Sequence, residues 1–202
     1  MSAETLAAIA IALGAGWASG LNAYAAVLVL GGAQRLGLVA LPHDLQVLGS
    51  PWVLGVAALL FALNFLADKI PYVDSINDAL QTFVRIPAGA LLAYGAAGGL
   101  SPEVAIIAGL LGGTLAAGTH VAKTGSRALI NASPEPFTNV LASLGEDVTV
   151  FGGLALAIAH PITFLCLLAI FVLLLLWLLP RLFRLAMKPF RRMTQGRHRP
   201  SA

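Results

Sequence analysis

The chain has 202 residues, of which 58% are hydrophobic and 10% are charged, and its formal net charge is +3. Soluble domains contain about 25% charged residues, and a chain of this length cannot bury so much apolar surface away from water. The composition therefore excludes an ordinary soluble domain and predicts an integral membrane protein. The only cysteine, Cys166, excludes an intrachain disulfide.

Seven apolar segments follow one another, and a helix needs about 20 apolar residues to cross a bilayer. They are Leu6–Ala18, Leu21–Leu38, Pro51–Ala67, Leu80–Gly99, Pro102–Thr119, Phe137–His160 and Ile162–Leu179. The first segment is short, and the break from Ser19 to Asn22 is too short for an exposed loop. We expect seven transmembrane helices if the first segment crosses, or six if it is a half-helix or a re-entrant helix.

The sequence thus predicts an all-α, polytopic helix bundle in which residues 1–180 form a single transmembrane domain. A weak internal duplication of a helical hairpin is a further hypothesis. One apolar helix runs into ADKIPYVDSIND and another into VAKTGSRALINASPEP, and a helix that carries charge follows each. Both hairpins would have the same orientation, so the duplication would be parallel.

Basic residues indicate the orientation, because cytoplasmic segments of membrane proteins carry an excess of Lys and Arg. Seven of the 12 basic residues lie between Arg181 and Arg199. We expect residues 181–202 to be a cytoplasmic tail that binds anionic lipids, in the cell (inner) membrane. Asp68–Asp78 and His120–Pro136 are then expected to be two long cytoplasmic loops that fold back into the bundle.

Two adjacent acids, Glu146 and Asp147, interrupt the apolar segment Phe137–His160. A charge deep in a bilayer costs roughly 2.5–3.5 kcal/mol on insertion scales and persists only beside protein or water. Adjacent helical residues point about 100° apart, so the two acids are expected to meet different partners. They are interpreted as a site for a proton, a cation or a substrate. The alternative is a structural ion pair with one of three cations, Lys123, Arg127 or Arg85.

A basic stripe follows the glycine-rich sequence GLLGGTLAAGT. His120, Lys123 and Arg127 are three and four residues apart, which places them on one face of a helix. The stripe is interpreted as a site for an anion or phosphate, as a neutraliser of Glu146, or as the positive charge of a cytoplasmic helix end. No His, Cys or Asp cluster has metal-ligand spacing, so we expect neither a metal nor another cofactor.

Two further polar segments lie at helix ends. ADKIPYVDSIND contains Asp68, Lys69 and Asp74, with Pro71 favouring an extended bend. Asp68 and Lys69 are expected to line the cytoplasmic entry of a pathway, and a solvated loop is the alternative. NASPEPFTN holds Glu135 between two prolines and is interpreted as part of a site or as a rigid helix boundary.

GLNAY begins the second apolar segment directly after a glycine break. Backbone groups freed by such a break can coordinate an ion or a substrate, so Asn22 is a candidate site residue. A kink bonded to a neighbouring helix is the alternative. Small residues such as Gly16 and Gly112 favour close helix packing, and Gly145 is expected to let another helix approach beside Glu146.

Together, GLNAY, ADKIPYVDS, the H-x-x-K-x-x-x-R stretch from His120, NASPEPFTN and the following S-x-x-E/D step resemble a membrane family catalogued as domain of unknown function 4126. The resemblance covers about Gly20 to Pro161 and leaves the Leu-rich helix and basic tail outside. It implies a small multi-pass membrane protein of prokaryotic type and no established reaction. It also implies one shared site made of Asp68, Lys69, Asp74, His120, Lys123, Arg127, Pro134, Glu135 and Asn139.

The leading hypothesis is a small transporter or channel for an ion or small solute, anionic solutes included. Glu146 and Asp147 would respond to protons or cations, while three cations would balance them or bind an anion, namely Arg85, Lys123 and Arg127. The chain is expected to contact the lipid bilayer and not to bind nucleic acid, and a homo-oligomer that encloses a pathway is a further hypothesis.

Two alternatives come from other classes. The first is a membrane-embedded enzyme acting on a lipid or a phosphorylated headgroup, in which the basic stripe holds phosphate and an Asp or Glu acts as a base. It is not favoured, because the sequence contains no known nucleophile constellation, phosphate-binding loop or metal motif. The second is a non-catalytic membrane assembly protein, with which the many small residues also agree.

Overall fold

The computed structural model describes residues 2–70, 72–131 and 136–195. Within these ranges every element is helical, as the sequence predicts. The elements are α1 (Ala3–Arg35), the 3₁₀ helix η1 (His43–Gly49), α2 (Pro51–Ala67), α3 (Val73–Ala96), α4 (Pro102–Asn131), α5 (Pro136–Ala159) and α6 (Pro161–Gln195).

The chain divides into two compact units, Met1–Cys166 and Leu167–Ala202. The first unit contains α1 to α5 and the start of α6, and it holds all the features described below. In the second unit α6 continues, and the Arg181 guanidinium stacks 3.4 Å from the centroid of the Trp177 ring. The single domain expected for residues 1–180 and the tail expected for residues 181–202 stay predictions.

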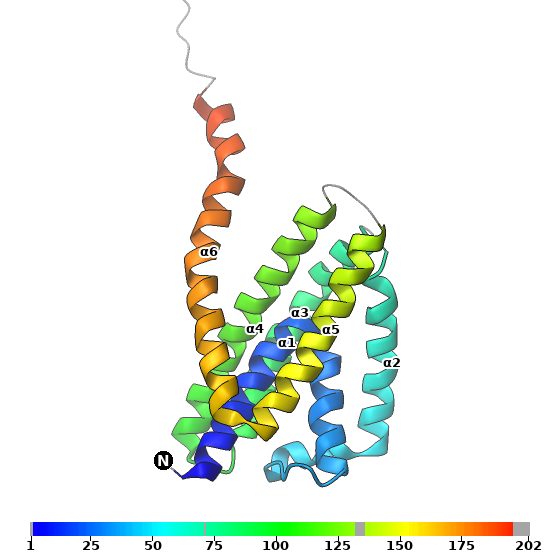
Figure 1. Cartoon of the computed structure of the whole chain (residues 1–202), viewed down its shortest axis with the longest axis vertical. Helices are drawn as coiled ribbons and strands as arrows, with labels where there is room; N and C mark the ends of the chain where they lie inside the picture. Colours follow the sequence, from blue (N-terminus) through cyan, green and yellow to red (C-terminus); the bar gives the residue numbers. More distant parts are fainter. Residues whose placement is uncertain (1, 71, 132–135, 196–202) are drawn as a thin grey trace, which may run out of the picture. The chain divides into compact units, whose positions relative to one another are not determined.

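Helix α1 is broken at Asn22, whose backbone is extended (φ −156°, ψ 100°). Before the break, Gly14 faces Ala157 near the end of α5; after it, Gly31 faces Leu48 in η1. The chain therefore runs into the bundle, turns at Asn22 and runs back, so that the two halves of α1 point in opposite directions (Figure 1). The break expected between Ser19 and Asn22 is therefore observed, and the choice between six and seven crossings stays a prediction.

Among the described residues, four helices are long and apolar enough to cross a membrane by length and composition, counting α1 over both of its halves, and the bent pair of η1 and α2 would make a fifth. The four are α1, α4, α5 from Phe137 and α6 as far as Leu178. Helix α3, which carries Asp74, Asp78 and Arg85, is not among them. The expected count of six or seven crossings is therefore not confirmed.

The first unit has large apolar side chains outside and small or charged ones inside. Trp52 is 87% exposed and Phe83 82% exposed, whereas Arg85 and Arg127 are each 1% exposed. In water this distribution would leave apolar area exposed and ionised groups buried, both unfavourable. In lipid the apolar exterior is solvated, so the distribution is that of a membrane protein.

The two long loops expected at Asp68–Asp78 and His120–Pro136 are wrong. Helix α3 already begins at Val73 and α4 continues to Asn131, so most of both segments is helical. Backbone groups away from water must be hydrogen-bonded internally, which favours helix even where the side chains are polar. Pro136 begins α5, in keeping with the expected helix boundary.

Candidate functional site

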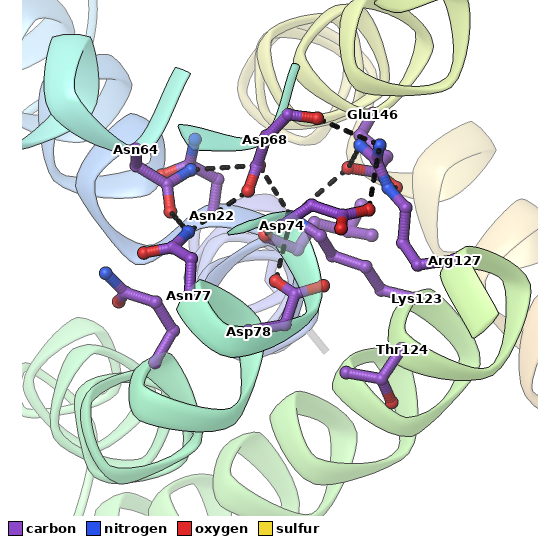
Figure 2. Close-up of polar contacts among 12 residues, drawn as sticks. Asn22, Asn64, Asp68, Asp74, Asn77, Asp78, Lys123, Thr124, Arg127 and Glu146 are labelled. Carbon is purple, nitrogen blue, oxygen red and sulfur yellow. Dashed lines mark hydrogen bonds and ion pairs between the residues drawn. The ribbon is translucent and has the colours of Figure 1, made fainter. Parts of the chain in front are cut away.

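Nine charged side chains meet inside the bundle, beside the break in α1. They form what we call the charge cluster: Asp68, Lys69, Asp74, Asp78, Arg85, Lys123, Arg127, Glu146 and Asp147. They come from the end of α2 and from α3, α4 and α5, and most are buried (Figure 2). Sequence-distant segments are therefore held together by charge.

Lys123 lies at the centre of the cluster. Its ammonium is 2.9 Å from Asp68, 3.2 Å from Glu146 and 3.4 Å from Asp78, so it joins acids of three elements (Figure 2). It also donates to the backbone carbonyl of Leu21, at 3.3 Å, directly before the break in α1. One cation on α4 thus binds the end of the first half of α1.

Arg127, one turn further along α4, binds Glu146 with two hydrogen bonds. Its Nε lies 3.0 Å from Oε1 and its Nη2 2.8 Å from Oε2, the bidentate geometry that makes such pairs strong. Its Nη1 donates to the Asp68 carbonyl at 3.1 Å and to the side chain of Asn139. The expected neutralisation of Glu146 by the basic stripe is what the structure shows.

Arg85 has a different partner from the one considered in the sequence. It donates to Asp78 at 2.8 Å, seven residues earlier on the same helix, and not to Glu146 or Asp147. The Nδ1 of His120 lies 3.3 Å from Arg85, and its Nε2 lies 2.7 Å from the Thr82 hydroxyl. His120 is therefore a buried hydrogen-bonding group of the cluster.

Amide side chains complete the cluster, and sequence reasoning missed most of them. Asn64 donates to Asp68 at 3.1 Å and accepts from Asn77 at 2.8 Å, while Asn131 donates to both oxygens of Asp74. A signal existed for Asn64, which is the one polar side chain within the apolar segment Pro51–Ala67. Asn131 begins the NASPEPFTN segment, which the sequence indicated as part of a site or as a helix boundary.

Asn22 connects the break in α1 to the cluster. Its Oδ1 accepts from the Ala25 amide at 3.1 Å and so caps the second half of the helix. Its Nδ2 donates to Asp147 at 3.2 Å. Glu146 and Asp147 thus meet different partners, as expected from their 100° separation.

Two charges of the cluster, Lys69 and Asp147, have no ion pair with any described residue. The Lys69 ammonium instead donates to the Phe65 carbonyl at 3.1 Å and to the Ser143 hydroxyl at 3.4 Å, and lies over the Phe65 ring. Burial lowers the pKa of Lys69 below its ordinary value, against the opposing charges of Asp147 and Asp68. The Oδ2 of Asp147 is buried without a hydrogen bond.

Asp68 is the opposite case. Burial disfavours its charged form, but the Lys123 ammonium, aided by Arg85 and Arg127, outweighs burial and holds the pKa of Asp68 below its ordinary value. Asp68 therefore stays ionised as a structural anion of the cluster.

The structure brings eleven of the twelve predicted site residues together, and their role in a pathway stays a prediction. Glu135, like Pro134, lies outside the described residues. The close approach expected at Gly145 is wrong, since a Cβ there would meet nothing within 4 Å. In the described ranges, no three His, Cys, Asp or Glu side chains are placed to hold a metal ion. The eleven are Asn22, Asp68, Lys69, Asp74, Arg85, His120, Lys123, Arg127, Asn139, Glu146 and Asp147.

A family model described as a domain of unknown function, DUF4126, matches residues 9–181. The chain belongs to the DUF4126 family. The match begins before Gly20 and continues beyond Pro161, so it includes the Leu-rich helix that the sequence resemblance left outside. Comparisons of this DUF4126 chain with curated proteins and with solved structures gave no match.

Proposed function

We propose that this chain is a small integral membrane transporter or channel for an ion or small solute, with the charge cluster as its intramembrane site. The observation that supports this most is the position of the cluster at the break of α1, where Lys123 binds the Leu21 carbonyl and Asn22 binds Asp147. Discontinuous helices that present free backbone ends to a polar site are a recurring feature of transporters.

Stability alone is a poor explanation for the cluster. Replacing a buried ion pair by apolar side chains is often neutral or stabilising, because desolvation costs as much as the pair gains. A chain of DUF4126 composition has many apolar residues with which to fill this volume. The presence of nine charged side chains in one cluster therefore favours a functional site over a purely stabilising one.

The charge balance favours a proton or a cation over an anion. Arg85, Lys123 and Arg127 are all bound to carboxylates, which leaves few donors for an anionic solute. With every group ionised, the cluster has four cations and five carboxylates and a net charge of −1. An added proton or monovalent cation would neutralise it.

The enzyme alternative receives less support from this geometry. A phosphorylated headgroup would need donors from the basic stripe, but Lys123 and Arg127 already bind carboxylates and His120 is bonded to the Thr82 hydroxyl. A non-catalytic assembly protein agrees with the close helix packing but gives no reason for the unpaired Asp147.

We further propose the cell (inner) membrane as the location, with the C-terminus, residues 68–72 and residues 132–135 on the cytoplasmic side. The basic residues beyond Arg181 would bind anionic lipids on that side. A second copy of the chain is a candidate partner for enclosing a pathway, as in many small transporters.

Flux measurements on purified protein in proteoliposomes would test the function. A pH gradient with an internal pH dye, followed by a panel of monovalent cations and small anions, would report movement of each. We expect proton or cation movement in wild type and in Val148→Ala, which changes an exposed side chain beside Asp147. Flux should fall at least about tenfold in Asp147→Asn, a barrier increase of about 1.4 kcal/mol. Absence of flux for every ion and solute, in protein that stays folded and monodisperse, would overturn the proposal.

A further inference from the structure

We infer that Asp147 is the group of the cluster that takes up and releases a proton, with Lys69 as its movable counter-charge, while Glu146 is a fixed structural anion. This inference deepens the proposed function and rests on it for its physiological meaning. The proton-binding step itself is a property of the folded protein and can be measured without transport.

The argument begins with the pairing of the nine charges. Seven of them take part in the ion pairs that connect α2, α3, α4 and α5. Among the described residues, Asp147 and Lys69 are the two that remain. Protonation of any paired carboxylate would break an ion pair, whereas protonation of Asp147 breaks none.

Asp147 is poorly supported as an anion. It is 9% exposed, its Oδ1 accepts one hydrogen bond from the neutral Asn22 amide, and its Oδ2 has no partner. An ionised carboxylate buried with a bare oxygen is unfavourable, and binding a proton removes that charge. The proton needs no cavity, because it is carried by a carboxyl oxygen that is already present.

Four neighbouring elements contribute polar or charged groups near Asp147. Helix α1 offers only the neutral Asn22; the end of α2 offers Asp68 and Lys69; α4 offers Lys123, which is already shared among other acids. Helix α3 directs Asp78 and Arg85 at each other. Lys69 is therefore the one cation of the described cluster that is free to compensate Asp147.

Lys69 lies close enough to do so. Its ammonium donates to Ser143, which is four residues before Asp147 on α5. Residues four apart on a helix have Cβ atoms about 5–6 Å from each other, so the Lys69 ammonium lies about one helical turn from Asp147. Lys69 is half-buried and has a long flexible stem, and its present bonds to Phe65 and Ser143 are to neutral groups. Deprotonated Asp147 would attract it across that turn.

Glu146 has the opposite environment. Two hydrogen bonds from Arg127 and the Lys123 ammonium at 3.2 Å bind both of its oxygens. Loss of its charge would break the bidentate pair with Arg127 and remove one of the three acids around Lys123. The adjacent acids of α5 thus have different roles: Glu146 is a structural anion, and Asp147 binds the proton.

Proton binding at Asp147 also affects the break in α1, because the Asn22 side chain contacts both. The Asn22 amide donates to Asp147 with its nitrogen and caps the second half of α1 with its oxygen. Protonated Asp147 accepts that hydrogen bond less strongly than the carboxylate does, because charge-assisted bonds are about twice as strong. The state of Asp147 is therefore coupled to the turn at which α1 reverses.

Infrared difference spectra of the full-length protein in nanodiscs, recorded against pH over the range in which it stays folded, would test the inference. Wild type should show the carbonyl band of a protonated carboxyl that titrates with pH. We expect Asp147→Asn to lose this band, Asp147→Glu to move it, and Val148→Ala and Glu146→Gln to keep it.

Lys69 supplies the second arm of the test. Removing a cation about one helical turn away disfavours the carboxylate, so Lys69→Gln should move the midpoint of the band to higher pH by about one unit. Lys69→Arg keeps the charge and should leave the midpoint close to that of wild type. A band that persists in Asp147→Asn, or a midpoint that Lys69→Gln does not move, would overturn the assignment.

The two proposals can fail separately. A band that behaves as described in protein without any flux would keep the proton site and refute transport. Flux that survives in Asp147→Asn, with no titrating band in wild type, would keep transport and refute Asp147 as the proton-binding group.

Discussion

The backbones of α1 and α4 touch where Gly16 faces Gly112, so that a Cβ on Gly16 would lie 2.5 Å from the Gly112 Cα. No rotation of a side chain relieves such a contact, because both sides of it are backbone. Together with Gly20, whose Cβ would lie 2.4 Å from the Ala116 carbonyl oxygen, this contact packs the first half of α1 directly against α4 up to the break.

Gly16→Ala is therefore expected to destabilise the protein although alanine is the better helix former. Overpacking of a tight contact costs about 1–3 kcal/mol, more than the 0.5–1 kcal/mol that alanine gains over glycine in a helix. Thermal unfolding in detergent would measure the loss. Gly145→Ala and Gly152→Ala are matched controls, since nothing lies within 4 Å of a Cβ at either position, and both should be neutral or slightly stabilising. Equal stability of Gly16→Ala and the controls would contradict the observed contact.

The Arg127–Glu146 pair provides a second prediction. Arg127→Gln should cost about 3–5 kcal/mol of stability, because it removes a buried cation and leaves the half-buried Glu146 with the Lys123 ammonium as its partner. The double variant Arg127→Gln with Glu146→Gln should lose less than the sum of the two single variants. Chemical unfolding of all four proteins closes a double-mutant cycle. A coupling free energy near zero would mean that the two groups do not depend on each other.

Asn22 can be separated into its two roles. Asn22→Ser keeps an oxygen that can cap the Ala25 amide but is too short to bind Asp147, whereas Asn22→Ala loses both bonds. Loss of a cap costs about 0.5–2 kcal/mol. Hydrogen exchange in residues 23–35 should therefore be faster in Asn22→Ala and nearly unchanged in Asn22→Ser. Both variants should alter the titration at Asp147, and equal exchange in the two would contradict the capping role.

The lowered pKa of Asp68 predicts that the stability of the folded protein decreases in acid. Its pKa is lower in the folded protein than the ordinary value near 3.9, so folding favours its charged form. The stabilisation is fully present above the unfolded pKa and disappears as pH falls through the folded pKa. Asp68→Asn should therefore be less stable than wild type at neutral pH, and the difference should shrink in acid. A difference that is independent of pH would mean that its charge does not contribute.

The sequence predicted features that depend on neighbouring residues of one helix, but not contacts between segments that are far apart in the chain. The common face of His120, Lys123 and Arg127 follows from helical spacing, and so do the different partners of Glu146 and Asp147. The break before Asn22 was visible because glycine and an amide interrupt an apolar run. These are local properties of one helix.

Contacts between distant segments were not predictable in the same way. Asn131 binds Asp74 across 57 positions, and nothing near either residue indicates the other. The loops expected around Asp74 and His120 are wrong because the charged side chains of both segments are buried and do not face water. Here the charges are solvated by one another, which lets both segments remain helical.

The hydrogen bond between Arg85 and Asp78 has a consequence for the order in which the protein is made. Both groups belong to α3, so this helix carries one neutralised pair of its own when it leaves the ribosome. Lys123 and Arg127 come later and have no acidic partner on α4, since the carboxylates that they bind are on residues made before and after that helix. A nascent chain that stops short of Glu146 contains four cations of the cluster but only three of its carboxylates, so the cations of the cluster are fully compensated only once Glu146 has been synthesised.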